Sequence, residues 1–159
     1  LEAAQGTTYP IVIVGSGPLE QELRARAAAL GLANVHFVGH LGEEDKVALL
    51  QLCSVLLFPS HLRSEAFGIS LLEGAMYGKP MISCEIGTGT SYINAHGETG
   101  LVVPPSNPAA FREAMRVLWD NPEQAQEMGR KASQRYQQLF TSERMGQQMA
   151  SLYRELLNG

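Results

Sequence analysis

Residues 55–80 read VLLFPSHLRSEAFGISLLEGAMYGKP and contain the most informative pattern in the chain. The apolar run Val55–Pro59 predicts a buried strand. A polar loop follows it as far as Gly68. Apolar residues then recur at helical spacing over Ile69–Met76, and Gly78-Lys79-Pro80 is typical of a helix end. The segment therefore predicts a strand, a loop and a helix in that order.

Apolar runs rich in β-branched residues recur about every twenty residues, and helical patterns lie between most of them. Strands without polar alternation that are separated by helices predict a Rossmann-like parallel sheet covered by helices on both faces. Loops at the carboxyl ends of such strands form ligand sites, and Glu65–Ser70 follows one of these ends. The five predicted strands are Ile11–Val14, Val35–Val38, Val55–Pro59, Met81–Cys84 and Leu101–Val103.

The chain after Pro108 is predicted to be helical to its end. Pro108 suits the first turn of a helix, and the Asn121-Pro122 pair ends that helix. Thr141 is the predicted N-cap of the last helix, which carries an apolar stripe from Met145 to Leu156.

The composition argues against several classes of protein. A chain of 159 residues, 45% apolar, 18% charged and with a net charge of −4, suits one globular domain and argues against a nucleic-acid surface. Cys53 and Cys84 are too few for a disulfide framework and favour a reducing compartment. The sequence shows no metal-ligand spacing, no signal-peptide pattern and no apolar run long enough to span a bilayer. We therefore expect a cytoplasmic domain without a metal and, because it begins with Leu1, a piece of a longer protein.

Two carboxylates flank the predicted start of the helix after Gly68. Glu65 lies in the loop before it, and Glu73 lies about 7 Å along the helix axis from the first turn. A helix N-terminus offers free backbone N–H groups and a positive dipole end to a diphosphate, and Glu73 would then lie near the ribose. Ser70 shares a face with Glu73, whereas Arg63 either contacts the ligand or pairs with Glu65. The strand, the loop, the helix and the two glutamates in this order predict a nucleotide-sugar site. The two glutamates alone also fit an incidental acidic pair on a surface helix.

Three other segments are candidates for the same site. Gly15-Ser16-Gly17 follows a strand, but Glu20 replaces the third glycine of a dinucleotide fingerprint, so a tight turn that lines the site is the better prediction. The polar loop Gly87–Ser91 either contacts phosphate oxygens or is a plain connection. His40, at the end of a strand, either borders the base pocket or is an exposed loop residue.

In this order the motifs resemble the retaining glycosyltransferases of family 4, two-domain enzymes of the GT-B type. Their C-terminal, donor-binding domain carries a pair of glutamates spaced like Glu65 and Glu73. The resemblance covers nearly the whole chain. The matching segments are IVIVGSGP (11–18), VHFVG (35–39), FPS (58–60), EAFG (65–68), EGAM (73–76), GKP (78–80), TGLVVP (99–104) and FT (140–141).

The resemblance implies that Glu65 is the catalytic candidate, acting on hydroxyl groups of the donor sugar as a positioning group. It implies that a sugar passes from a GDP- or UDP-linked donor, without metal or another cofactor, to a saccharide or lipid-linked acceptor. The configuration would be retained, and the reaction would take place at the cytoplasmic face of a membrane. The donor-binding residues that the resemblance implies are Phe67, Gly68, Ile69, Ser70 and Glu73. Gly15, Ser16 and His40 are added as donor-binding candidates because they follow predicted strands.

Two departures from the family pattern lead to further expectations. Ser91 stands where the family commonly has a glutamate, which leaves the contact made by its loop open. The family's domain also opens with a central strand and a Gly-Arg…Lys-Gly segment that would precede Leu1. Their loss predicts a rearranged sheet, with Ile11–Val14 paired to Val55–Phe58 or to a strand from another chain. We also expect the chain alone to be inactive, because the basic residues and the acceptor domain lie outside it.

We expect a nucleotide-sugar-binding domain over residues 1–141 and a C-terminal helix over residues 142–159 that packs toward an N-terminal domain outside this chain. A homo-oligomer is the alternative partner for this helix. The competing hypothesis for function is a non-catalytic module that binds a nucleotide or a protein partner. A nucleotide-sugar epimerase would need an acid–base pair that the sequence does not show.

Overall fold

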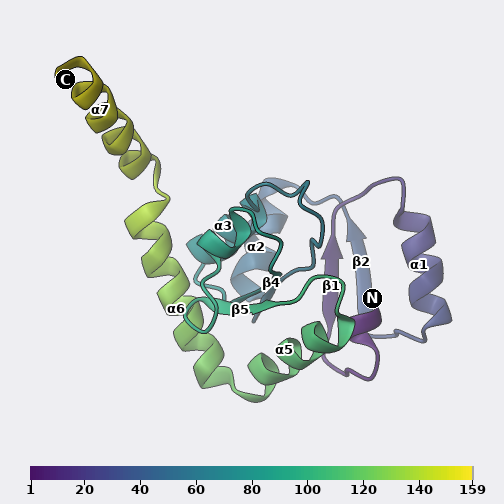
Figure 1. Cartoon of the computed structure of the whole chain (residues 1–159). Helices are drawn as coiled ribbons and strands as arrows, with labels where there is room; N and C mark the ends of the chain where they lie inside the picture. The colour runs from purple at the N-terminus through teal and green to yellow at the C-terminus, as the bar shows by residue number, and fades with distance from the viewer. Residues whose placement is uncertain (159) are drawn as a thin grey trace.

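The computed structural model describes residues 1–158 and contains the predicted alternation of strands and helices (Figure 1). All five predicted strands are confirmed, and each end lies within one residue of its predicted position. A short 3₁₀ helix, η1 (Glu2–Ala4), precedes them. The strands are β1 (Ile11–Val14), β2 (Val35–Gly39), β3 (Leu56–Phe58), β4 (Met81–Cys84) and β5 (Gly100–Val103). The helices are α1 (Glu20–Ala29), α2 (Glu43–Leu52), α3 (Ile69–Met76), α4 (Thr90–Ile93), α5 (Pro108–Asp120), α6 (Pro122–Leu139) and α7 (Ser142–Asn158).

The strands form two parallel sheets instead of one. β1 pairs with β2, and Ile11 lies opposite Val35. β4 pairs with both β3 and β5 and is the middle strand of the second sheet. The predicted pairing of Ile11–Val14 with Val55–Phe58 is wrong, because β1 and β3 share no ladder within residues 1–158. Ile11 and Leu57 instead pack against one core cluster that contains Phe111 of α5, so side-chain packing joins the two sheets.

Burial differs between the two sheets. All four residues of β4 are buried, which confirms the prediction of cover on both faces for this strand. In β1 the side chains alternate: Ile11 packs with Phe37 against Ala27 of α1, whereas Val12 and Val14 are 40% and 43% exposed. The prediction of two covered faces is therefore wrong for the β1–β2 sheet.

Helix α3 lies between the second sheet and α6. Leu71 and Ala75 are buried against Met81 of β4 and Ala132 of α6. Met76, which helical periodicity predicts to be in the core, is exposed instead. The core face of α3 is therefore narrower than its composition indicates: Leu71 and Ala75 lie on one side of the helix, and Met76 lies about 100° around the axis from Ala75.

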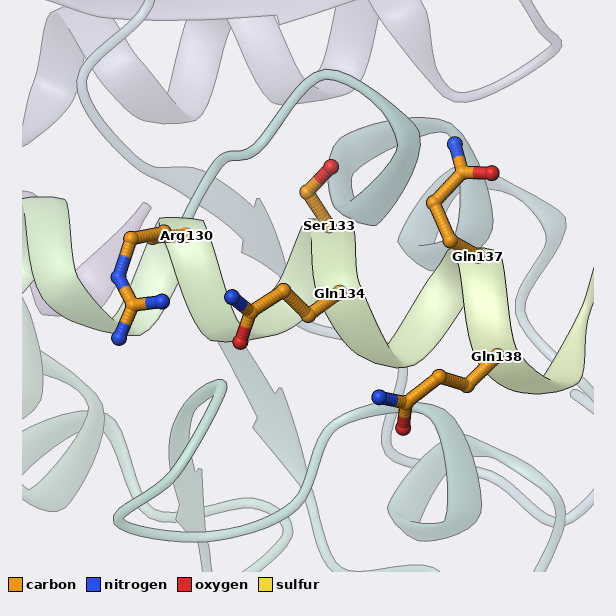
Figure 2. A pocket seen from close by; sticks show the side chains of 5 residues that line it. All are labelled: Arg130, Ser133, Gln134, Gln137 and Gln138. Carbon is orange, nitrogen blue, oxygen red and sulfur yellow. The ribbon is translucent and has the colours of Figure 1, made fainter.

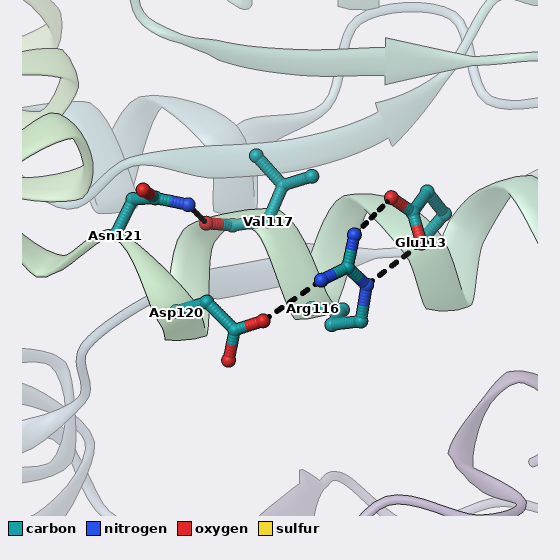
Figure 3. A network of polar contacts seen from close by, with 5 residues as sticks. All are labelled: Glu113, Arg116, Val117, Asp120 and Asn121. Atoms are coloured by element: carbon teal, nitrogen blue, oxygen red, sulfur yellow. Dashed lines mark hydrogen bonds and ion pairs between the residues drawn. The ribbon is translucent and has the colours of Figure 1, made fainter.

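Helix α5 begins and ends as predicted. Pro108 occupies its first position, and the Asn107 side chain accepts a hydrogen bond from the amide of Ala110 at 3.0 Å. At the other end Asn121 Nδ2 donates to the carbonyl of Val117 at 2.8 Å (Figure 3). Pro122 then starts α6.

Helix α7 projects from the rest of the molecule beyond the end of α6 (Figure 1). Thr141 Oγ1 accepts a hydrogen bond from the amide of Arg144 at 3.3 Å, which confirms the predicted N-cap. Its apolar stripe, from Met145 to Leu156, is exposed. Its packing toward another domain or a second copy stays a prediction, and Gly159 lies outside the described residues. None of the helices in residues 1–158 combines the length and hydropathy needed to span a bilayer.

Candidate functional site

Glu65 lies in the loop between β3 and α3, and its side chain turns back to the start of that helix. Its Oε1 accepts a hydrogen bond from the amide of Gly68 at 3.0 Å and a longer one from the amide of Phe67 at 3.4 Å. Gly68 is the N-cap residue of α3 and has a φ of 94°, a conformation that favours glycine. The structure therefore brings together Glu65 and two of the predicted donor-binding residues. A ligand oxygen bound to these amides would replace the carboxylate.

The first turn of α3 supplies further backbone donors. Its helical hydrogen bonds begin with the amide of Leu71, which donates to the carbonyl of Gly68 at 2.9 Å. The amides of Ile69 and Ser70 precede this bond, and neither has an acceptor within the part of the chain that the structure describes. Both residues are exposed. Free amides at the positive end of a helix dipole suit an anion such as a phosphate.

Glu73 lies one turn further along α3 and is half-buried. Its Oε1 accepts a hydrogen bond from Lys46 Nζ at 2.8 Å. Lys46 belongs to α2 and also contacts Glu43 Oε2 at 2.9 Å. These hydrogen bonds, the one to Glu73 first, raise the pKa of Lys46 above its ordinary value of 10.5. The ammonium is therefore protonated at any physiological pH.

Sequence reasoning missed Lys46. In the sequence its neighbour Glu43, three residues earlier on the same predicted helix, already accounts for a lysine there. Glu73 is 27 residues away along the chain, so only the tertiary structure reveals the second partner. One sequence alone carries no signal for this contact.

A hollow of about 280 Å³ opens beside Glu65. It offers hydroxyl, imidazole and carboxylate groups to a polar ligand. Of the two alternatives for Arg63, the ion pair with Glu65 is wrong, because Arg63 Nη1 lies 3.5 Å from the carbonyl oxygen of Ile86 instead. A contact between Arg63 and the ligand stays a prediction. The hollow is lined by Ser60, His61, Leu62, Ser64 and Glu65.

The predicted polar loop after β4 packs against the Glu65 loop. The amide of Gly89 donates to the carbonyl of Ala66 at 3.0 Å. A Cβ atom at Gly89 would lie 2.7 Å from Phe67 Cδ2, so no other residue fits without a shift. The sequence predicts that this loop either contacts phosphate oxygens or is a plain connection. The structure shows that it packs against the Glu65 loop, and its contact with phosphate stays a prediction.

Glu85 organises this loop from its start. Its carboxylate accepts hydrogen bonds from the amide of Gly87 at 2.9 Å and from Ser91 Oγ at 2.8 Å. The bond from Gly87, and then that from Ser91, lower the pKa of Glu85. Ser91, which stands where the resembled family has a glutamate, is thus bonded to a glutamate from the same loop.

Gly15, Ser16 and His40 lie together at the carboxyl ends of β1 and β2. The amide of Gly15 donates to the carbonyl of Gly39 at 2.7 Å, and Gly15 has a φ of 118°. Gly15, Ser16 and His40 are all exposed, so the exposed-loop alternative for His40 agrees with the structure. Among the described residues no hydrogen bond joins these loops to Glu65 or Glu73, and their role in donor binding stays a prediction.

Two other polar surfaces each lie on a single helix. A larger hollow of about 470 Å³ is open and lies on one helix, α6 (Figure 2). Its lining residues, which include no carboxylate, are Arg130, Ser133, Gln134, Gln137 and Gln138. On α5, Arg116 bonds to Glu113 at 2.6 Å and to Asp120 at 2.9 Å as exposed pairs within the helix (Figure 3). Within residues 1–158 no group of three or more His, Cys, Asp or Glu residues is arranged to hold a metal ion.

The fold and the site define the class of protein. Parallel sheets flanked by helices form a Rossmann-like domain of the kind found as the C-terminal half of GT-B glycosyltransferases. Residues 1–135 match the family described as glycosyl transferases group 1, and the chain belongs to that family. The predicted family resemblance is confirmed at this level.

Two curated relatives and one solved structure illustrate the similarity. The chain is 76% identical over 142 residues to D-rhamnosyltransferase WbpZ of Pseudomonas aeruginosa, covering 89% of this chain and 37% of that protein. It is 51% identical over 157 residues to O-antigen chain mannosyltransferase C of Escherichia coli, covering 99% and 42%. Anabaena Alr3699/HepE in complex with UDP has the same fold, with a TM-score of 0.85, 21% identity and coverage of 96% and 43%. The chain thus spans about two fifths of the length of the relatives it matches.

Proposed function

We propose that this chain is the donor-binding part of a family-4 glycosyltransferase, which transfers a sugar from a nucleotide-sugar to an acceptor hydroxyl with retention of configuration. One observation carries the proposal: Glu65 lies just before the N-terminus of α3 and Glu73 lies one turn inside the helix, while the amides of Ile69 and Ser70 between them have no acceptor within residues 1–158. Membership of the glycosyltransferase family supports it, as do relatives that transfer rhamnose and mannose.

Each part of the donor has a proposed position. The diphosphate binds at the start of α3, where backbone amides and the helix dipole can hold it without a metal ion. The sugar occupies the hollow beside Glu65, whose carboxylate accepts hydrogen bonds from sugar hydroxyl groups. The ribose hydroxyls bond to Glu73. We propose a GDP- or UDP-linked donor, and the UDP complex of Anabaena HepE supports a nucleotide at this fold.

Sugar transfer itself is proposed for the whole protein. The chain covers 37% and 42% of the two relatives, which leaves room in such a protein for a domain that binds the acceptor. We propose that this domain binds a saccharide or lipid-linked acceptor at the cytoplasmic side of a membrane. The exposed apolar stripe of α7 would then pack toward it.

The test is a thermal-shift measurement with GDP, UDP and ADP. At a nucleotide concentration of about 100 times Kd, binding adds about 2.7 kcal/mol to the stability of the folded chain, or about 5–10 °C in Tm. We expect this shift from GDP or UDP. It should be strongly reduced in Glu73→Gln, which keeps the shape of the side chain and removes its charge. Glu123→Gln, on the exposed first turn of α6, is the matched control and should keep the full shift.

The outcomes separate binding of the nucleotide from binding of a protein partner. A shift with GDP or UDP that depends on Glu73 supports donor binding. No shift with any of the three nucleotides contradicts donor binding and favours a module that binds a protein partner. A shift that Glu73→Gln leaves intact contradicts the proposed position of the ribose.

A further inference from the structure

Lys46 and Glu73 form an ion pair that joins two helices. The distance between Lys46 Nζ and Glu73 Oε1 is 2.8 Å, and the two side chains are 32% and 30% exposed. Lys46 Nζ also lies 2.9 Å from Glu43 Oε2, but the Glu43 side chain is 76% exposed. The pair with Glu73 is the better shielded of the two, so solvent weakens it less.

The position of Glu73 on α3 explains what a cation does there. Glu73 is followed by only three residues of the helix, and the last turn contains no basic residue. A negative charge near the C-terminal end of a helix is unfavourable with the helix dipole, and the ammonium of Lys46 offsets this effect.

The pair also restricts the Glu73 side chain before any ligand binds. A free glutamate side chain has several rotamers. A ligand that binds only one of them must order the side chain, and the conformational entropy lost lowers its affinity. Lys46 already holds Oε1. Oε2 has no hydrogen bond within the described residues and is left as an acceptor. Two of the three ammonium donors of Lys46 are used by carboxylates, which favours a role in positioning over direct binding of a phosphate.

We infer that Lys46 is a positioning residue for Glu73: it holds Oε1 so that Oε2 accepts hydrogen bonds from the ribose hydroxyls of a bound nucleoside diphosphate. Lys46 would thereby make the site selective for a ribonucleotide over its 2′,3′-dideoxy analogue. This inference rests on the proposed function, because it requires Glu73 to bind the ribose.

The experiment measures dissociation constants by calorimetry on the whole chain. The probes are GDP or UDP, whichever gives the larger thermal shift, and the 2′,3′-dideoxy form of the same nucleotide. The proteins are the wild type, Lys46→Met, Glu73→Gln and the double variant. Lys131→Met is the matched control, because Lys131 lies on α6 and its only ion pair among the described residues is a 3.8 Å contact with Glu127.

We expect Lys46→Met to bind the ribonucleotide about tenfold more weakly, which corresponds to about 1.4 kcal/mol. Its affinity for the dideoxy form should stay within about twofold of the wild type, because that ligand lacks the hydroxyls that Glu73 would bond. The double variant should bind no more weakly than Glu73→Gln, because both substitutions remove the same interaction. Lys46→Arg keeps the cation and should restore most of the preference. Lys131→Met should behave as the wild type does.

The results distinguish this inference from the function on which it rests. If Lys46→Met raises the dissociation constants of both nucleotides equally, or changes neither, the positioning role of Lys46 is overturned. The proposed function is still supported in that case, provided that the wild type prefers the ribonucleotide. A wild type that binds both forms equally contradicts ribose binding by Glu73 itself. If Lys46→Met lowers the Tm of the ligand-free chain, Lys46→Gln, which also removes the cation and leaves Glu73 in place, gives the same comparison with a polar side chain.

Discussion

Replacement of Gly129 by alanine tests how α6 holds α3, the helix that carries Glu73. Gly129 is buried, and an added Cβ would lie 2.1 Å from the carbonyl oxygen of Gly78 and 3.1 Å from Pro80 Cδ. Gly78 and Pro80 belong to the turn that leads from α3 into β4, so the contact is with backbone and cannot be relieved by a side-chain rotation. To reach the 3.0 Å limit of real Cβ contacts, α6 and this turn must separate by about 1 Å.

The expected magnitude is the difference between two opposing effects. Alanine is better than glycine in a helix interior by about 1 kcal/mol. Overpacking a filled core costs about 1–3 kcal/mol, and a backbone contact belongs at the upper end of this range. We therefore expect Gly129→Ala to lower the free energy of unfolding by about 1–2 kcal/mol, or the Tm by about 2–8 °C. Gly146→Ala in α7 is the matched control: its Cβ would meet nothing within 4 Å, so the change should be neutral or stabilising.

The assay is urea denaturation of the wild type and both variants, followed by far-UV circular dichroism. A loss of stability in Gly129→Ala together with no loss in Gly146→Ala would confirm the reasoning. A Gly129→Ala chain as stable as the wild type would refute it, because the contact between α6 and the turn after α3 would then be too loose to exclude a methyl group.

Two further predictions concern stability. Glu85→Gln should lower stability at about pH 7, and the difference from the wild type should shrink as the pH falls below 4.5. Hydrogen bonds from the Gly87 amide and then from Ser91 lower the pKa of Glu85 in the folded chain. Their stabilisation is therefore present above the ordinary value of 4.5 and is lost as the pH falls through the lowered value. A difference in urea midpoint that stays constant as the pH is lowered from about 7 to below 4.5 would contradict this. Asn94→Ala should lower the free energy of unfolding by about 1–3 kcal/mol in the same assay. The side-chain amide of Asn94 is fully buried and bonds to Ser83 Oγ at 2.8 Å and to Thr99 Oγ1 at 3.2 Å, so both hydroxyls would lose a hydrogen-bond partner. A loss below about 0.5 kcal/mol would mean that these groups find other partners.

The local pattern of the sequence was sufficient for the order of the elements. Apolar runs without alternation mark the strands, and residues with fixed backbone preferences, such as Pro108 and Thr141, mark helix ends. These signals act over a few residues, so they survive in the folded chain. The proximity of Glu65 to the start of α3 is local in the same sense, because Gly68 is only three positions further along the chain.

Contacts between distant residues were not predictable in this way. Nothing local indicates that β1 stays apart from β3, since side chains such as Ile11 and Leu57 can share a core whether or not their strands pair. The ion pair of Lys46 with Glu73 joins positions 27 residues apart, and Lys46 has a nearer partner in Glu43 that explains it locally.

The sequence by itself therefore determined the α/β class, the helix that begins after Gly68 and the two glutamates at that helix, because each follows from periodicity and from turn-forming residues close together in the chain. Only the tertiary structure decided how the strands divide into two sheets and which atoms hold each carboxylate. The physical reason is that ladder hydrogen bonds and ion pairs depend on distances of a few ångströms between segments far apart in the sequence. Those distances result from the packing of the whole core, with α3 held between the second sheet and α6.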